Sequence, residues 1–184
     1  MTDPFSIALV VGSPSARSRT AALAQHVADR LSRHAFRVRI IKVRDLPAQA
    51  LIHADASAPE VASALRTIEQ ADGVIVASPV YKAAYSGVLK SFLDLLPQRG
   101  LQGKVVLPLL TGGTLAHVLA LDYGLRPVLQ SLEPRQVVSG LFLLDQWITL
   151  TEDDGAELNP EVGPRLETIV QGFVDGVRSV YEYR

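Results

Sequence analysis

The sequence predicts a three-layer α/β/α sandwich built on a five-stranded parallel sheet. Short apolar runs rich in Val and Ile alternate with longer stretches whose apolar residues recur every three or four positions. The first pattern is typical of strands buried on both faces, and the second of helices that cover them. Strands that alternate with helices are joined by right-handed crossovers, so the strands are expected to be parallel. The predicted strands are 7–11, 36–43, 73–79, 104–110 and 137–143, and the predicted helices are 18–34, 60–71, 86–96, 114–132 and 164–181.

The first strand and helix form the clearest unit. Residues 7–11 are an uninterrupted apolar run, and the Gly-Ser-Pro sequence at 12–14 stops it. In the stretch 18–34, apolar residues recur at four-residue spacing and form the buried stripe of an amphipathic helix. The residues of this stripe are Leu23, Val27 and Leu31.

The second and third strands are predicted from different patterns. Residues 36–43 alternate apolar with basic residues, which indicates a strand near an edge of the sheet. Residues 44–59 are polar and contain Pro, so they are expected to form a connection between elements. The apolar residues of 60–71 follow helical spacing, and 73–79 is a buried strand that ends in a turn.

The C-terminal half continues the alternation. The helix at 86–96 is closed by Pro97, and the fourth strand at 104–110 ends in a glycine-rich turn. Residues 145–163 are acidic and rich in Gly and Pro, so an irregular excursion is expected. The last helix, 164–181, presents a regular apolar face.

Composition favours one globular domain over residues 1–184 and excludes several classes of protein. The chain is 48% hydrophobic and 20% charged, and a chain of this length buries roughly two thirds of its unfolded surface. It contains no Cys, which excludes disulfides, thiolate catalysis, iron–sulfur clusters and zinc–thiolate sites. The net charge of −1 argues against nucleic acid or an anionic membrane surface as a partner.

No targeting or membrane segment is expected. Residues 1–6 carry no basic region, and the apolar run 7–11 is too short for the core of a signal peptide. No stretch reaches about 18 uninterrupted apolar residues, the length that spans a membrane. We therefore expect the protein to be cytoplasmic.

Three loops are candidates for a binding site. Ligands of such sheets bind beyond the carboxyl ends of the strands, where the strand order reverses. Loop 12–20 is rich in hydroxyl groups and Arg and enters a helix N-terminus, which favours a phosphate. Loop 78–87 places backbone groups and an aromatic residue after a buried strand, an edge suited to a flat heterocycle. Loop 111–114 is Gly-rich, so its backbone amides can approach a ligand closely.

Each loop also has a simpler interpretation. Ser18 alone is an ordinary helix cap, and the tyrosines of loop 78–87 are ordinary surface residues. Loop 111–114 alone is a common strand-to-helix turn. The combination of all three at one edge of the sheet is more specific than any one of them.

Several familiar sites are absent from the sequence. There is no G-x-x-x-x-G-K-[ST] sequence and no G-x-G-x-x-G after a strand, which disfavours a nucleotide triphosphatase and a dinucleotide-fingerprint dehydrogenase. The four His residues show no H-x-x-x-H spacing, so we predict no metal site.

The three loops resemble the NAD(P)H-dependent FMN reductase family. The similar sequences are Gly12-Ser-Pro with Ser18-Arg-Thr20, Ala77-Ser-Pro-Val-Tyr-Lys-Ala-Ala-Tyr-Ser-Gly-Val-Leu-Lys90, and Thr111-Gly-Gly-Thr114. The similarity extends over about residues 7–142 and fades after Asp145. Within the family, the sequence looks most like the reductase components of two-component alkanesulfonate monooxygenase systems.

The resemblance implies a flavodoxin-like fold with strand order 2-1-3-4-5. It implies reduction of FMN by NADPH or NADH and delivery of reduced FMN to a monooxygenase in sulfonate or sulfur assimilation. No catalytic side chain is implied, since hydride transfer needs only stacked cofactor rings. Alternatives are a quinone or azo-dye reductase with permanently bound FMN and a flavodoxin-type electron-transfer module. Because flavodoxins tend to be strongly acidic, the net charge of −1 disfavours the last.

The resemblance also implies which residues bind FMN. The phosphate is expected at the first loop, the isoalloxazine over residues 79–82, and its pyrimidine edge near 111–114. Relatives often carry Arg directly after Ser-Pro, where Ser15 stands here, and Arg17 is the available substitute. The expected cofactor-binding residues are Ser13, Arg17, Ser18, Arg19, Thr20, Pro79, Val80, Tyr81, Lys82, Ser86, Thr111, Gly112, Gly113 and Thr114.

The helices 86–96 and 114–132 are apolar on more than one face, which predicts subunit contacts. The resemblance likewise implies a homodimer or homotetramer. Within 114–132 the apolar stripe shifts by about two residues, and similar reductases carry an inserted Tyr that Tyr123 matches. We therefore expect a π-bulge around Tyr123 at a subunit interface, with a simple kink at Pro127 as the alternative.

Overall fold

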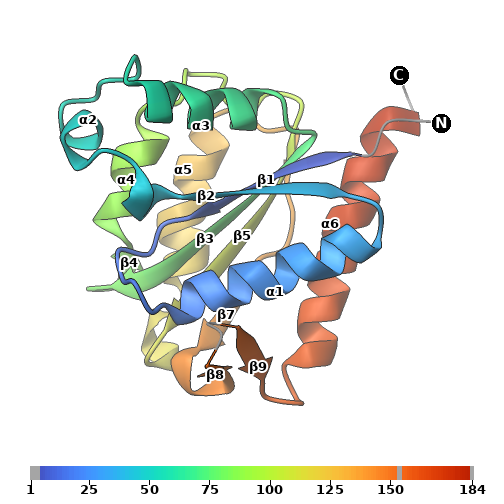
Figure 1. Ribbon diagram of the computed structural model, residues 1–184. Helices are drawn as coiled ribbons and strands as arrows, with labels where there is room; N and C mark the ends of the chain where they lie inside the picture. Colours follow the sequence, from blue (N-terminus) through green and yellow to red (C-terminus); the bar gives the residue numbers. More distant parts are fainter. Residues whose placement is uncertain (1–4, 153–154, 183–184) are drawn as a thin grey trace.

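A parallel sheet with helices on both faces forms the centre of the molecule (Figure 1). The computed structural model describes residues 5–152 and 155–182. The strands of this sheet are β1 (Ser6–Val11), β2 (Arg37–Lys42), β3 (Gly73–Tyr81), β5 (Val105–Gly112), β6 (Gln136–Val137) and β7 (Leu141–Leu144), and β4 (Ala84–Tyr85) pairs antiparallel with the end of β3. They lie in the order β2-β1-β3-β5, and β6 and β7 share the outer position beside β5. The predicted parallel α/β sheet and its strand order are confirmed.

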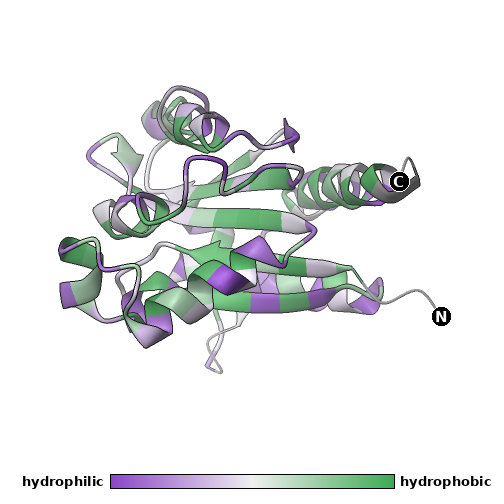
Figure 2. Ribbon diagram, turned by 90° about the horizontal axis from the view of Figure 1, so that it is seen from above, coloured by the Kyte–Doolittle hydropathy of each residue, from purple (hydrophilic) through white to green (hydrophobic). Residues whose placement is uncertain are grey.

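Helices cover both faces of the sheet. The helices α1 (Arg19–Arg33) and α6 (Gly163–Glu182) cover one face, and α3 (Pro59–Glu69), α4 (Gly87–Leu93) and α5 (Arg126–Ser131) cover the other. Figure 2 shows the central strands as largely hydrophobic, whereas the helices also carry hydrophilic residues. These elements confirm the three-layer sandwich, although α4 ends earlier than the predicted helix 86–96.

The uninterrupted apolar run 7–11 in β1 follows from the burial of this strand on both faces. Ala8 and Val10 belong to the core beneath α3 and α4, whereas Ile7, Leu9 and Val11 belong to the core beneath α1 and α6. Successive side chains of a strand point to opposite faces, so a strand covered on both sides must be apolar at every position.

The edge of the sheet at β2 is also as predicted. This strand pairs only with β1, and Arg37 and Arg39 alternate as exposed residues with partly buried apolar ones. Charged side chains on an edge strand hinder pairing with another chain. In α1, the predicted stripe of Leu23, Val27 and Leu31 is fully buried.

The predicted strand 137–143 is interrupted, which is a correction. The strands β6 and β7 pair with β5 on either side of a break that contains Gly140. A Cβ on Gly140 would lie 2.5 Å from the carbonyl oxygen of Pro108 in β5. Pro108 has no N–H to donate to the neighbouring strand. The backbone at residue 140 also lies so close to Pro108 that only Gly fits there. Regular pairing between β5 and the last strand therefore stops at this point.

The predicted connection 44–59 and the predicted excursion 145–163 both contain short regular elements. The connection 44–59 includes a 3₁₀ turn, η1 (Val43–Asp45), and the short helix α2 (Ala48–Ile52). The excursion 145–163 includes a 3₁₀ turn, η4 (Asp145–Trp147), and a hairpin of β8 (Ile148–Leu150) and β9 (Ala156–Leu158). The prediction of an irregular excursion at 145–163 was therefore wrong in this respect, because elements of three residues are too short to show a periodic pattern.

The predicted helix 114–132 is divided into three parts. A 3₁₀ turn, η2 (Leu115–His117), is followed by a π-helical segment, η3 (Ala120–Leu125), and then by α5. The N–H of Arg126 donates to the carbonyl oxygen of Leu121, five residues back. Pro127 has no N–H to continue the ordinary four-residue pattern. The predicted π-bulge around Tyr123 is confirmed, while its place at an interface remains a prediction.

The start of β1 and the end of α6 lie at the end of the sheet opposite the carboxyl ends of the strands (Figure 1). None of the helices in the described part of the chain is long and apolar enough to cross a membrane. Residues 1–4, on which the expectation about a signal peptide partly depends, lie outside that part.

Candidate functional site

The carboxyl ends of β1, β3 and β5 meet where the strand order reverses, between β1 and β3. Loops 12–20, 78–87 and 111–114 all leave the sheet at this edge, which lies near β4 in Figure 1. This is the place at which sheets of this topology bind ligands. The fold therefore brings to one edge the loops that the sequence indicated.

Hydrogen bonds join the three loops to one another. The N–H of Gly12 donates to the carbonyl oxygen of Ala77 at 2.8 Å, and the hydroxyl of Ser86 donates to the carbonyl oxygen of Gly12. The hydroxyl oxygens of Thr20 and Thr111 lie 2.7 Å apart. The first loop is thus connected both to the second loop and to the end of β5.

The first loop presents the positive end of α1. The hydroxyl of Ser18 caps this helix by accepting the N–H of Ala21 at 3.2 Å. Ser13 is buried, and its hydroxyl accepts the N–H of Ser15 at 3.4 Å. The first turn of α1 contains no acidic residue. No carboxylate of that turn therefore compensates the helix dipole or accepts from the first N–H groups. This arrangement suits a phosphate.

The two arginines of the first loop are placed differently. Arg19 Nε donates to the carbonyl oxygen of Ile148 in β8 at 3.2 Å, which orients its guanidinium. The other N–H groups of that side chain remain as donors for a ligand. Arg17 is exposed, and no hydrogen bond or ion pair involves it within the described residues.

The second loop is a hairpin rather than a simple turn. Strand β3 continues beyond the predicted end at Pro79 because β4 supplies an antiparallel partner, with Val80 opposite Tyr85 and Tyr81 opposite Ala84. Val80 is buried, whereas Tyr81 is 48% exposed at the open edge of the sheet. The sequence-based end of this strand was therefore wrong.

Two buried serines hold this hairpin against α4. The N–H of Ser86 donates to the hydroxyl of Ser78 at 2.9 Å, and the hydroxyl of Ser86 accepts the N–H of Leu89 at 3.1 Å. Ser86 also donates to Gly12, so its side chain contacts the protein on several sides. Sequence reasoning placed Ser78 in the second loop but did not select it as a site residue, because its contact with the N–H of Ser86 depends on the fold.

The third loop contains two glycines with different surroundings. A Cβ on Gly112 would lie 3.0 Å from Phe142 Cζ, so this position is tightly packed. Gly113 is exposed, and the nearest atom to a Cβ there would be Asp145 Oδ2 at 3.8 Å. Thr114 caps the 3₁₀ turn that follows. The backbone of Gly113 is therefore open to a ligand.

These residues fit FMN. A phosphate could be held by the first turn of α1 with the hydroxyls of Ser13 and Ser18 and the guanidinium of Arg19. A flat ring could lie against the exposed hairpin edge at Tyr81, with the open backbone of Gly113 at its rim. Both kinds of surface, one for an anion and one for a heterocycle, lie at the same strand ends.

Two histidines and the absence of a metal-binding cluster among the described residues characterise the titratable groups. Among these residues there is no group of three or more His, Asp or Glu side chains placed to hold a metal ion. His117 Nδ1, just after the third loop, is buried and has no hydrogen-bond partner among them. Desolvation and then the charge of Arg30 lower the pKa of His26, which lies on α1.

The fold also adds a segment that the sequence did not connect with the site. Trp147 packs against both cores, and β8 follows it directly. The contact from β8 to Arg19 is made by a backbone carbonyl, so residue type gives no signal for it.

The architecture is that of an α/β sandwich whose loops at the switch point suit a phosphate and a flat heterocycle. A sequence profile described as NADPH-dependent FMN reductase matches residues 5–149. The chain belongs to this family, and it is an oxidoreductase that uses FMN with NADPH or NADH.

Individual relatives agree with the family profile. The chain is 44% identical over 163 residues to the FMN reductase (NADPH) of Pseudomonas putida KT2440, covering 88% of this chain and 83% of that protein. It is 41% identical over 164 residues to the FMN reductase (NADPH) of Escherichia coli K12, covering 89% and 85%.

Solved structures confirm the flavodoxin-like fold. The apo form of an NADH:FMN oxidoreductase superposes with a TM-score of 0.84 at 44% identity, covering 92% of this chain and 88% of that one. A flavodoxin from the domain Archaea shares the fold alone, with a TM-score of 0.62 at 16% identity over 96% of this chain and 99% of that one.

Proposed function

We propose that residues 1–184 form one reductase domain that reduces FMN as a diffusible substrate and releases it to a separate FMNH2-dependent monooxygenase. The observation that carries the proposal is the open edge of the site, where Gly113 and Tyr81 are exposed and the first turn of α1 carries no acidic residue. A substrate that must leave needs such an edge. The resemblance to alkanesulfonate-system reductases supports a role in sulfonate or sulfur assimilation.

The proposed binding residues act through position rather than acid–base chemistry. The first loop would hold the phosphate through Ser13, Ser18, Arg19 and Thr20, with Arg17 as an additional cation. Pro79, Val80, Tyr81 and the backbone of Lys82 would support the ring. Ser86 and Thr111 would act mainly by fixing the loops, because their hydroxyls bond to Gly12 and Thr20. Gly112, Gly113 and Thr114 would border the pyrimidine edge of the ring.

The chemistry that FMN supplies when bound is the acceptance of a hydride from a reduced nicotinamide. The contribution of this chain is to hold the ring against the β3–β4 hairpin and leave its outer face accessible. Rigid placement by the loop-to-loop hydrogen bonds keeps that face in one orientation, which favours close stacking of the two rings.

Purification tests whether FMN is released. We expect colourless protein that oxidises NADPH or NADH only when FMN is added. Yellow protein whose activity survives extensive dialysis would instead support a quinone or azo-dye reductase with bound FMN. A protein that holds FMN tightly and shows no turnover with either nucleotide would support the electron-transfer alternative.

The proposed assembly is a homodimer or homotetramer through helices 86–96 and 114–132. Support comes from the second segment, where Leu115 and Leu119 are each 59% exposed and Tyr123 is 79% exposed. In α4, by contrast, Leu89, Phe92 and Leu93 are buried within the protomer. Light scattering on the wild-type protein and on Tyr123→Ser tests the interface, and we expect the variant to shift toward smaller species.

The proposed location is the cytoplasm, where reduced nicotinamide nucleotides are regenerated. Fractionation of cells that produce the full chain tests this location, with a periplasmic or membrane fraction as the contrary result.

A further inference from the structure

The tip of the β3–β4 hairpin has a conformation that its residues do not favour. Lys82 and Ala83 form a two-residue loop between the paired residues Tyr81 and Ala84, and their φ angles are +50° and +63°. Positive φ at both central positions is the mark of a type I′ turn, for which Asn-Gly is the preferred sequence. The Cβ atoms of Lys and Ala destabilise this left-handed backbone.

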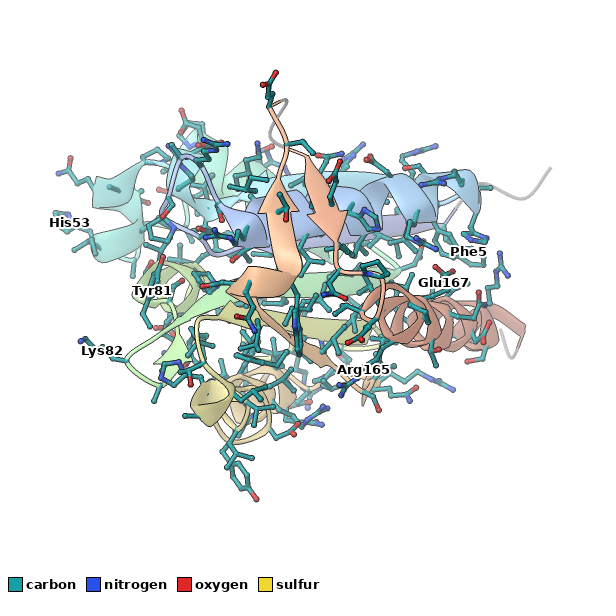
Figure 3. The ribbon with its side chains drawn as sticks, turned by 90° about the horizontal axis from the view of Figure 1, so that it is seen from below. Phe5, His53, Tyr81, Lys82, Arg165 and Glu167 are labelled. Atoms are coloured by element: carbon teal, nitrogen blue, oxygen red, sulfur yellow. The ribbon has the colours of Figure 1, made fainter. Side chains whose placement is uncertain are left out.

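The Lys82 side chain stands at this tip without a partner. In Figure 3 it extends outward from the hairpin, beyond Tyr81. No hydrogen bond or ion pair involves its ammonium group within the described residues. Lys90, farther along the same stretch of chain, is bound instead by both oxygens of Asp94 at 2.6 and 2.7 Å.

Neither packing nor a salt bridge therefore accounts for a lysine in this turn. A residue kept in an unfavourable backbone conformation is expected to have a use that compensates for it. The ammonium group of Lys82 makes no hydrogen bond or ion pair among the described residues and is available to a ligand. It stands at the tip of the hairpin that borders the candidate site (Figure 3).

We infer that Lys82 binds a phosphate group of the nicotinamide nucleotide, an inference that rests on the proposed function. The nicotinamide ring must stack on the outer face of the flavin, whose own phosphate is proposed to lie at loop 12–20. We place the phosphates of the nicotinamide nucleotide beyond the flavin, at the hairpin tip that carries Lys82. A lysine ammonium is a point charge that binds phosphate without a fixed orientation.

Two phosphate sources share this chemistry: the pyrophosphate present in NADH and NADPH, and the 2′-phosphate present only in NADPH. The variants Lys82→Gln and Lys82→Asn remove the charge, and Lys82→Arg keeps it. The control Lys42→Gln removes the same charge from an exposed residue at the end of β2. Steady-state kinetics with each nucleotide measures KM, and calorimetric titration of NADP+ and NAD+ measures Kd without turnover.

We expect both neutral variants to raise KM and Kd by about five- to tenfold, and Lys82→Arg to restore most of the affinity. A loss confined to NADPH and NADP+ identifies the 2′-phosphate, and an equal loss for both nucleotides identifies the pyrophosphate. Added salt should weaken the wild-type contact and leave the neutral variants less affected. Lys42→Gln should resemble wild type.

Thermal unfolding separates this role from a structural one. Asn is favoured in a type I′ turn, so Lys82→Asn should raise Tm while it weakens nucleotide binding. A purely structural role predicts that stability and affinity change in the same direction.

Unchanged KM and Kd for both nucleotides in Lys82→Gln would overturn the inference, as would a loss of affinity for FMN alone. A failure of the proposed function would give another result: wild-type protein would oxidise neither NADH nor NADPH in the presence of FMN. The calorimetric comparison still decides the role of Lys82 in that case.

Discussion

The hydroxyl oxygens of Thr20 and Thr111 lie 2.7 Å apart in a buried hydrogen bond that joins the first turn of α1 to the end of β5. The two residues are far apart in sequence, and each comes from a different loop of the candidate site. This bond fixes the distance between the proposed phosphate-binding turn and the glycine-rich loop. It therefore connects two loops of the proposed FMN site.

Replacing either threonine should destabilise the protein. Thr20→Val or Thr111→Val leaves the other hydroxyl buried without its partner, at an expected cost of about 1–3 kcal/mol in the free energy of unfolding. The double variant should lose less than the sum of the single losses, because it leaves no orphaned hydroxyl. Urea unfolding of all four proteins measures this coupling, and strictly additive losses would contradict it.

Gly12→Ala should destabilise the junction of β1 and α4. A Cβ on Gly12 would lie 2.5 Å from Leu89 Cβ, so the helix must shift, at an expected cost of about 1–3 kcal/mol. The matched control is Gly172→Ala within α6, where a Cβ meets nothing within 4 Å. The control should gain about 0.5–1 kcal/mol from helix propensity. Equal unfolding free energies for the two variants would refute this reading of the junction.

Gly113→Ala should weaken FMN binding and leave the stability of the protein nearly unchanged. A Cβ there has no protein atom nearer than 3.8 Å, so the free energy of unfolding should change by less than about 0.5 kcal/mol. If FMN lies against this backbone, its KM should rise. Gly112→Ala is the contrasting variant, since Phe142 lies 3.0 Å from its Cβ and stability should fall. An unchanged KM for FMN in Gly113→Ala would exclude close contact at this position.

Arg19→Ala tests the phosphate site. The contact from Arg19 Nε to Ile148 leaves other N–H groups for the phosphate, and a charge-assisted bond of this kind contributes about 1.5–3 kcal/mol. The KM for FMN should therefore rise by about tenfold or more, while that for riboflavin, which lacks the phosphate, should change little. Equal losses for the two flavins would assign Arg19 to the hairpin β8–β9 instead.

His26 should make stability depend on pH. Burial, followed by the charge of Arg30, lowers the pKa of His26 below its ordinary value of 6.5 in the folded protein. The unfolded chain then binds more protons, so stability decreases as pH falls from 6.5 toward the lowered pKa. The variant His26→Gln should show a smaller decrease in Tm over this interval. A steeper decrease in the variant would reverse the assigned sign.

Much of this molecule is visible in residue patterns because those patterns report burial. The run 7–11 is apolar at every position because both faces of β1 are covered, and Arg37 and Arg39 alternate because β2 is an edge. The π-helical segment was also predictable, since the shift of the apolar stripe and Pro127 both disturb regular helical bonding.

Other features depend on contacts between distant residues. The break at Gly140 arises from the carbonyl of Pro108, and the contact of Arg19 comes from the backbone of Ile148. Backbone groups are the same in every residue, so the sequence carries little information about which of them will meet. The hairpin 148–158 was likewise missed because its strands are too short to show alternation.

The sequence by itself determined the alternation of strands and helices, the three loops at one edge of the sheet and the family to which the chain is similar. Local periodicity and turn chemistry suffice for these features. Only the tertiary structure decided how the loops are joined, which hydroxyls are already bonded and where the free ammonium of Lys82 stands. These features depend on contacts between residues far apart in the chain. Such contacts form only when the helices pack against both faces of the sheet.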